Sequence, residues 1–101
     1  MEAACKGAKQ EGGTTIGILP SSDRSEGNEY LDHSIVTNLG IMRNSLVVLN
    51  GDLVVAIDGG YGTLSEIAIA TEYRKRILGL GTWDLDSVES HDSVDDILKE
   101  L

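Results

Sequence analysis

The sequence has little of several residue types, and each shortage excludes a class of protein. The single cysteine, Cys5, leaves no internal disulfide and has no Cys/His partner at zinc-site spacing. No apolar run approaches the roughly 20 residues that span a bilayer, and residues 1–8 lack the basic and apolar regions of a secretory signal. Eight basic residues against 17 acidic ones give a net charge of -9, which disfavours nucleic-acid binding. We therefore expect a cytoplasmic protein with no metal site, no nucleic-acid partner and no membrane partner.

What the sequence does contain is a series of short apolar runs that alternate with helix-type segments. At 101 residues it is long enough for a single small domain over residues 1–101. Helices are expected over residues 1–11, 38–49, 62–74 and 93–101, and strands over 14–19, 34–37, 52–57 and 76–80. A long loop covers residues 20–34, and an acidic irregular link covers 81–92. This alternation predicts an α/β fold with a parallel sheet flanked by helices.

Local signals mark several helix ends. Gly12 and Gly13 are typical of a C-terminal glycine cap, while Asn38 and Ser93 are typical caps at the start of a helix. Cys5 is expected to be an ordinary buried residue. We place both histidines, His33 and His91, in solvated loops.

The sequence of residues 58–66, DGGYGTLSE, joins a buried-strand pattern directly to a helical one. Gly59, Gly60 and Gly62 lack a Cβ atom, so they can adopt positive φ and let backbone N–H groups converge on a phosphate. The N-terminus of the following helix adds a partial positive charge. The turn that contains Tyr61 is therefore a predicted anion site. Because basic residues are sparse, Arg24 and Arg43 are the candidate cationic partners.

Arg43 and Glu66 each have a functional and a structural interpretation. Arg43 lies within the apolar arc of its predicted helix, so it either clamps a ligand phosphate, forms an ion pair with Asp52 or Asp58, or extends past the apolar face to solvent. For Glu66 we favour a capping box with Thr63, and the alternative is a general base or a stabiliser of a developing sugar cation.

Two further features of the same region also have a structural and a functional interpretation. Asp58 is expected to cap the turn, with a bond to sugar hydroxyls as the alternative. The aromatic side chains Tyr61 and Trp83 are expected to be packing residues, with stacking on a base as the alternative.

Three segments together resemble a known family. Arg43-Asn44, residues 52–57 and residues 59–66 are similar to the Arg…Pro-Gly-Gly-x-Gly-Thr-x-x-Glu signature of LONELY GUY-type, lysine-decarboxylase-like Rossmann proteins. The likeness is greatest to their molybdenum-cofactor-carrier-like branch, and residues 13–20 and 79–83 extend it along the chain. The resemblance implies a Rossmann-like domain that forms a homodimer.

The resemblance also implies two functions. Enzymatic members cleave nucleoside 5′-monophosphates to the free base and ribose 5-phosphate, and their catalytic roles would fall on Arg43 and Glu66. The phosphate would then be held by the glycine-rich turn, Gly59, Gly60, Tyr61 and Gly62, together with Thr63. Carrier members bind the molybdenum cofactor, which is a phosphorylated pterin.

Departures from the family pattern favour binding over catalysis. Asp58 replaces the motif proline, and Asn44 replaces the lysine that usually follows the arginine.

Relatives have an upstream strand, helix and strand, so we expect a sheet without its N-terminal strands and either marginal stability or self-association. The leading hypothesis is a binding protein for a phosphorylated nucleotide or a molybdenum-cofactor-like ligand. The alternatives are a phosphoribohydrolase and an inactive truncated remnant.

Overall fold

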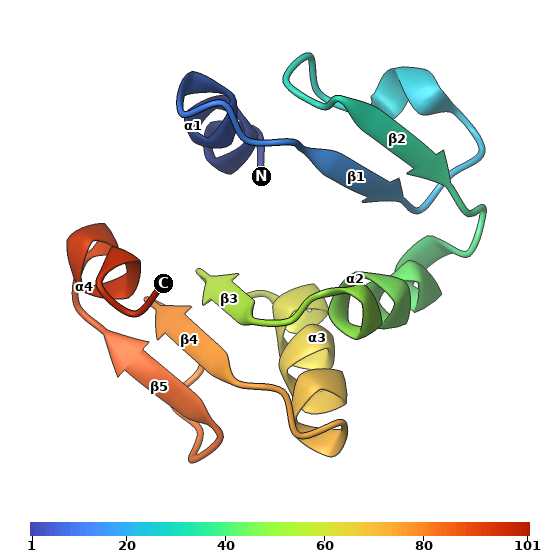
Figure 1. Ribbon diagram of the computed structural model, residues 1–101. Helices are drawn as coiled ribbons and strands as arrows, with labels where there is room; N and C mark the ends of the chain where they lie inside the picture. The colour runs from blue at the N-terminus through green and yellow to red at the C-terminus, as the bar shows by residue number, and fades with distance from the viewer. The chain divides into compact units, whose positions relative to one another are not determined.

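A computed structural model describes all residues from 1 to 101, and the chain divides into two compact units, Met1–Arg43 and Asn44–Leu101 (Figure 1). Each unit contains parallel strands and helices, which confirms the predicted α/β class. None of the helices has both the length and the apolar character that crossing a membrane requires.

The first unit is built on two parallel strands. Its elements are α1 (Glu2–Gln10), β1 (Ile16–Leu19), the 3-10 helix η1 (Arg24–Glu26), β2 (His33–Val36) and the 3-10 helix η2 (Gly40–Arg43). β1 and β2 pair from Ile16 with His33 to Leu19 with Val36. The predicted glycine cap of α1 is confirmed, because Gly12 has a φ of 77° and the Gly13 N–H donates to the Ala8 carbonyl at 2.8 Å.

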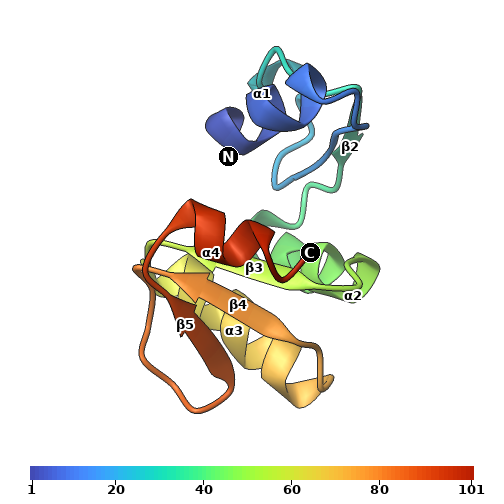
Figure 2. The same ribbon diagram turned by 60° about the vertical axis from the view of Figure 1, so that its left-hand side comes forward.

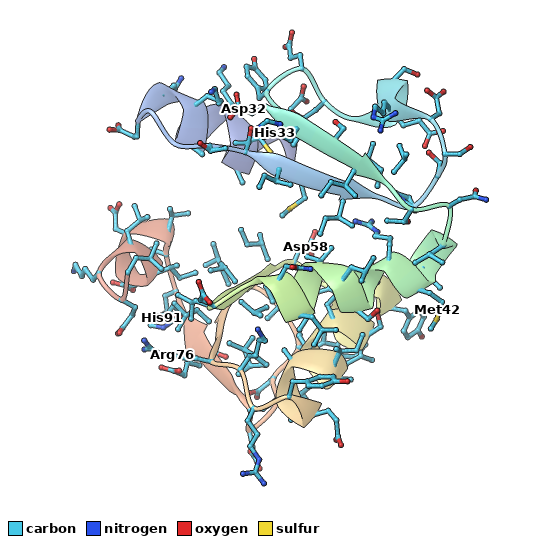
Figure 3. The ribbon with its side chains drawn as sticks, turned by 45° about the vertical axis from the view of Figure 1, so that its right-hand side comes forward. Asp32, His33, Met42, Asp58, Arg76 and His91 are labelled. Atoms are coloured by element: carbon cyan, nitrogen blue, oxygen red, sulfur yellow. The ribbon has the colours of Figure 1, made fainter.

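A polar network joins the parts of the first unit. Thr15 is a buried polar residue, and its hydroxyl donates to the Tyr30 carbonyl. The Asp32 carboxylate accepts the Thr15 N–H at 2.8 Å and the Lys9 ammonium at 2.7 Å, so it connects α1 to the segments before β1 and β2 (Figure 3). These bonds hold the pKa of Asp32 below its usual value, the Lys9 bond first and the Thr15 bond second.

The second unit is a three-stranded parallel sheet with helices on both faces. Its elements are α2 (Asn44–Asn50), β3 (Val54–Ile57), α3 (Tyr61–Glu72), β4 (Ile77–Leu80), β5 (Val88–His91) and α4 (Val94–Leu98). The strand order is β3-β4-β5. Figures 1 and 2 show α2 and α3 on one face of this sheet and α4 on the other. Ser93 caps α4, as predicted, by accepting the Asp96 N–H at 3.1 Å.

The core of the second unit lies between the sheet and the pair α2 and α3. It is formed by buried side chains of α2, all three strands and α3: Val48, Ala56, Ile67, Ala70, Ile77 and Val88. Alternate residues of a strand face opposite sides of a sheet, so Leu78 belongs to the other face, where α4 packs on β4. Hydrophobic burial against helices on both faces explains why β4 is apolar throughout.

Four local predictions are wrong. The acidic link contains β5, a strand with one buried residue, Val88, and three polar residues that hide its pattern. His33 and His91 lie in β2 and β5 rather than in loops. Asn38 has a φ of 53° and caps no helix, because the chain enters η2 at Gly40 and becomes α-helical only at Asn44. Cys5 is half-buried, and its sulfur accepts a bond from Asn28.

Candidate functional site

The site is formed where β3 and β4 end side by side. Ile57 pairs with Leu80, and each strand is followed at once by a residue in the left-handed conformation, Asp58 with a φ of 61° and Gly81 with a φ of 59°. The Asp58 N–H donates to the Leu80 carbonyl at 3.0 Å, so the two strands stay paired up to this point. The carboxyl edge of a parallel sheet is where open α/β folds bind their ligands.

Beyond this edge the surface is hollowed. The hollow measures about 250 Å³ and is lined by Asp58, Gly59, Gly81, Thr82 and Trp83. The hydroxyl oxygen of Thr82 is buried there and has no hydrogen-bond partner. Buried polar groups are usually hydrogen-bonded, so this hydroxyl is an exception within the fold.

The glycine-rich turn leads from β3 into α3 and contains all five predicted phosphate-binding residues, Gly59, Gly60, Tyr61, Gly62 and Thr63. α3 begins at Tyr61, and Gly60 is its N-cap without a side-chain capping bond. The N–H groups of a helix's first turn have no intrahelical acceptor, so those of this turn are available to an anion. A Cβ atom placed on Gly60 would meet nothing within 4 Å, which shows that the space beside the helix N-terminus is open.

Two details of this turn differ from the prediction. The one positive φ angle in this turn is at Asp58, whereas Gly59, Gly60 and Gly62 have none. The capping box is also wrong, because α3 starts two residues before Thr63, which puts Thr63 inside the first turn and Glu66 beyond it. Glu66 is half-buried in α3.

Asn44 holds the first turn of α3 in place, a role that the sequence did not reveal. The residue is 4% exposed, and its side-chain amide donates to the Gly62 carbonyl at 3.4 Å and to the Ser65 hydroxyl at 3.0 Å. The Ser65 hydroxyl in turn donates to the Gly62 carbonyl at 2.7 Å. The only available signal was the asparagine that stands in place of the family lysine.

Arg43 ends η2 in the first unit. Its Nη1 atom donates to the carbonyl of Ile18 in β1 at 3.0 Å, a backbone partner that the sequence did not indicate. Its Nε atom is buried and has no hydrogen-bond partner. Arg24, the other cationic candidate, is an exposed residue of η1.

Two aromatic rings stand beside the turn. Trp83 is half-buried, packs against the core and donates its indole N–H to the Gly60 carbonyl at 3.2 Å, which confirms its packing role. Tyr61 is 81% exposed, so the prediction that it packs is wrong. The two ring centroids are 6.1 Å apart with an interplanar angle of 31°. A Cβ atom on Gly59 would lie 3.1 Å from the indole nitrogen, so a glycine there permits the close approach.

Comparison with known proteins gives both solved and curated relatives. A molybdenum cofactor binding protein from the phototrophic bacterium Rippkaea orientalis is 38% identical, with a TM-score of 0.89, and the match covers 99% of this chain and 68% of that one. The molybdenum cofactor carrier protein of Chlamydomonas reinhardtii is 34% identical, with a TM-score of 0.83 and coverages of 96% and 65%. These matches confirm the Rossmann-like fold of the carrier proteins.

An uncharacterized protein of Archaeoglobus fulgidus is 44% identical over 80 residues, which are 79% of this chain and 52% of that protein. The chain thus spans about half the length of this curated relative. The model of the SLOG cluster4 family matches residues 1–100. The chain therefore belongs to the SLOG cluster4 family.

Proposed function

We propose that this chain binds a phosphorylated small molecule of the molybdenum-cofactor or nucleotide type, with its phosphate on the first turn of α3. The observation that carries the proposal is the glycine-rich turn, which leaves open space beside the N-terminus of a 12-residue helix at the carboxyl edge of the sheet. The unbonded N–H groups and the helix dipole both favour an anion there.

The negative net charge of the protein limits the ways in which it can bind a phosphate. With a net charge of -9, long-range attraction of a phosphate by the whole protein is unfavourable. Backbone N–H groups must therefore supply most of the recognition, which suits Gly59, Gly60 and Gly62 because they add no bulk. Thr63, in the first turn of α3, adds a hydroxyl.

The relatives support the same ligand class. Rippkaea orientalis and Chlamydomonas reinhardtii proteins that cover almost all of this chain are named for binding or carrying the molybdenum cofactor. The fit of that cofactor's phosphate to this chain rests on the open turn and on Asn44, which fixes the Gly62 carbonyl and so the direction of the neighbouring N–H groups. When bound, the cofactor would be cargo of a carrier.

A substitution at Gly60 tests the phosphate site. Gly60→Asp places a carboxylate at the N-cap, where Asp favours the helix but repels a phosphate. We expect ribose 5-phosphate to shift the amide NMR signals of residues 60–63 in the native protein, and ribose to leave them unchanged. Gly60→Asp should weaken binding by about tenfold or more, the equivalent of one lost charge-assisted hydrogen bond.

Gly60→Ala is the matched control, since its methyl group meets open space and brings no charge. It should retain binding, and both variants should retain the native circular dichroism spectrum. Equal affinity in Gly60→Asp and Gly60→Ala would contradict a phosphate on this turn.

One observation supports the alternative function, that of a phosphoribohydrolase. The buried Nε atom of Arg43 has no partner, which is what an arginine that awaits an anion would show. Chromatography of the protein incubated with nucleoside 5′-monophosphates tests this function directly, because only a hydrolase releases free base and ribose 5-phosphate.

A further inference from the structure

The hollow beyond β3 and β4 offers chemistry that a phosphate on α3 does not use. Its lining residues include the aromatic Trp83 and the acidic Asp58, and they include Thr82, whose hydroxyl oxygen is buried and unpartnered. A carboxylate repels a phosphate, and an aromatic face offers it no hydrogen bond. The hollow therefore suits a different part of the ligand from the glycine-rich turn.

Trp83 is a fixed flat wall of the hollow. Its indole N–H is bonded to the Gly60 carbonyl, its ring packs against the core, and Gly59 lets it lie against the turn. Tyr61, with its ring centroid 6.1 Å away and 81% of the residue exposed, stands beside it. Paired aromatic rings of this kind offer a surface on which a flat heterocycle can stack.

Asp58 lines the hollow and has a fixed backbone. The N–H bond to the Leu80 carbonyl and the φ of 61° hold the residue at the strand end. Proline, the family residue at this position, has no N–H and a φ near −65°, so it cannot form this turn. Asp is one of the few residues that tolerate the left-handed conformation, and its ionised carboxylate only accepts hydrogen bonds.

An acceptor of this kind selects a particular heterocycle edge. The 2-amino-4-oxopyrimidine ring, which pterins and guanine share, has a ring N–H next to an amino group, so one carboxylate can accept both hydrogen bonds. Adenine has an acceptor nitrogen in place of that ring N–H. Asp58 thus favours the first class and disfavours the second.

We propose that the hollow lined by Asp58, Thr82 and Trp83 binds a 2-amino-4-oxopyrimidine heterocycle, which stacks on Trp83 and donates its N–H edge to Asp58. The inference rests on the proposed function, since the phosphate of the same ligand would lie on α3. It adds the selection of pterin-type and guanine-type rings over adenine.

Trp83 is the single tryptophan of the chain, so its fluorescence reports on the hollow directly. We would titrate the native protein with GMP, AMP and ribose 5-phosphate and follow fluorescence together with calorimetry. GMP should quench Trp83 and bind about ten- to a hundredfold more tightly than AMP, the range expected for hydrogen bonds to a charged acceptor. Ribose 5-phosphate should bind without quenching.

Asp58→Asn tests the carboxylate with little change to the backbone, because Asn also tolerates positive φ. Its side-chain amide can pair with adenine, so the preference for GMP over AMP should fall at least tenfold, while the affinity for ribose 5-phosphate should not decrease. Asp95→Asn, an exposed residue of α4, removes the same charge elsewhere and should keep the preference.

The two proposals fail in different ways. Ribose 5-phosphate binding with no GMP quenching, or an unchanged preference in Asp58→Asn, would overturn the heterocycle site and leave the phosphate site standing. Quenching and preference without any binding of ribose 5-phosphate would overturn the phosphate site alone. No binding of any of the three probes would overturn both.

Discussion

The two compact units of this protein are stabilised in different ways. In the second unit, the core side chains Ile67, Ile77, Leu78 and Val48 are almost completely buried between a sheet and its helices. In the first unit no apolar side chain reaches that degree of burial, and the buried residue is polar, Thr15. The first unit is instead joined by strand pairing and by the Lys9, Asp32 and Thr15 network.

The difference shows why the candidate site lies where it does. A ligand that is recognised by backbone N–H groups requires those groups to be held still. α3 is anchored through Ile67 and Ala70 in the core, and its first turn is fixed by Asn44. The well-packed unit therefore carries the glycine-rich turn.

Truncation of a core isoleucine should give the largest effect. Ile67→Ala removes a fully buried side chain of α3 and should lower the free energy of unfolding by about 2–5 kcal/mol. The matched substitution in the first unit, Ile41→Ala, affects a residue that is 63% exposed and should change stability by no more than about 0.5 kcal/mol. Urea unfolding measures both variants, and equal losses would contradict the contrast between the units.

A smaller effect is expected at the ends of α1 and α3. Both helices end with the same pair of backbone hydrogen bonds, but the left-handed residue is Gly12 after α1 and Arg74 after α3. Arg74→Gly should stabilise the protein by about 0.5–1 kcal/mol because it relieves the strain of positive φ. Gly12→Ala should destabilise it by a similar amount, and thermal melts would show opposite shifts. Shifts of the same sign would refute this explanation.

The smallest effect should be a pH dependence of the first unit through Asp32. Because the pKa of Asp32 is lowered in the folded state, first by Lys9 and then by Thr15, its contribution is present above the unfolded pKa of about 3.9. It is lost as the pH falls through the lower folded value. The side chain remains 29% exposed, so the effect is screened by solvent.

Urea unfolding of native protein and Asp32→Asn between pH 7 and pH 3 would measure this contribution. The stability difference between them should shrink as the pH falls below about 4. The second unit contains a comparable carboxylate, Glu89, whose pKa is lowered by the guanidinium of Arg76 (labelled in Figure 3). The same measurement on Glu89→Gln therefore provides a comparison between the two units. A difference for Asp32→Asn that stays constant over this range would show that the carboxylate charge plays no part.

Features with strong local signals were predicted correctly. The glycine cap of α1, the strands β3 and β4 and the Ser93 cap of α4 depend on residue types within a few positions of one another. β5 was missed because its sequence, Val88-Glu89-Ser90-His91, has a single apolar residue that is buried only after pairing with β4. The start of α3 was misplaced because Gly60 caps it without a side chain, and glycine gives no capping signal of its own.

The sequence by itself determined the α/β class, the family and the strand-to-helix turn that carries the candidate phosphate site, because periodicity and glycine spacing are local properties. Only the tertiary structure decided which residues surround that turn. Parallel pairing of β3 and β4 brings Thr82 and Trp83 to Asp58, across more than 20 positions of sequence. Packing of α2 on α3 likewise brings Asn44 to Gly62. Contacts between distant segments depend on strand order and helix packing, and no local pattern contains them.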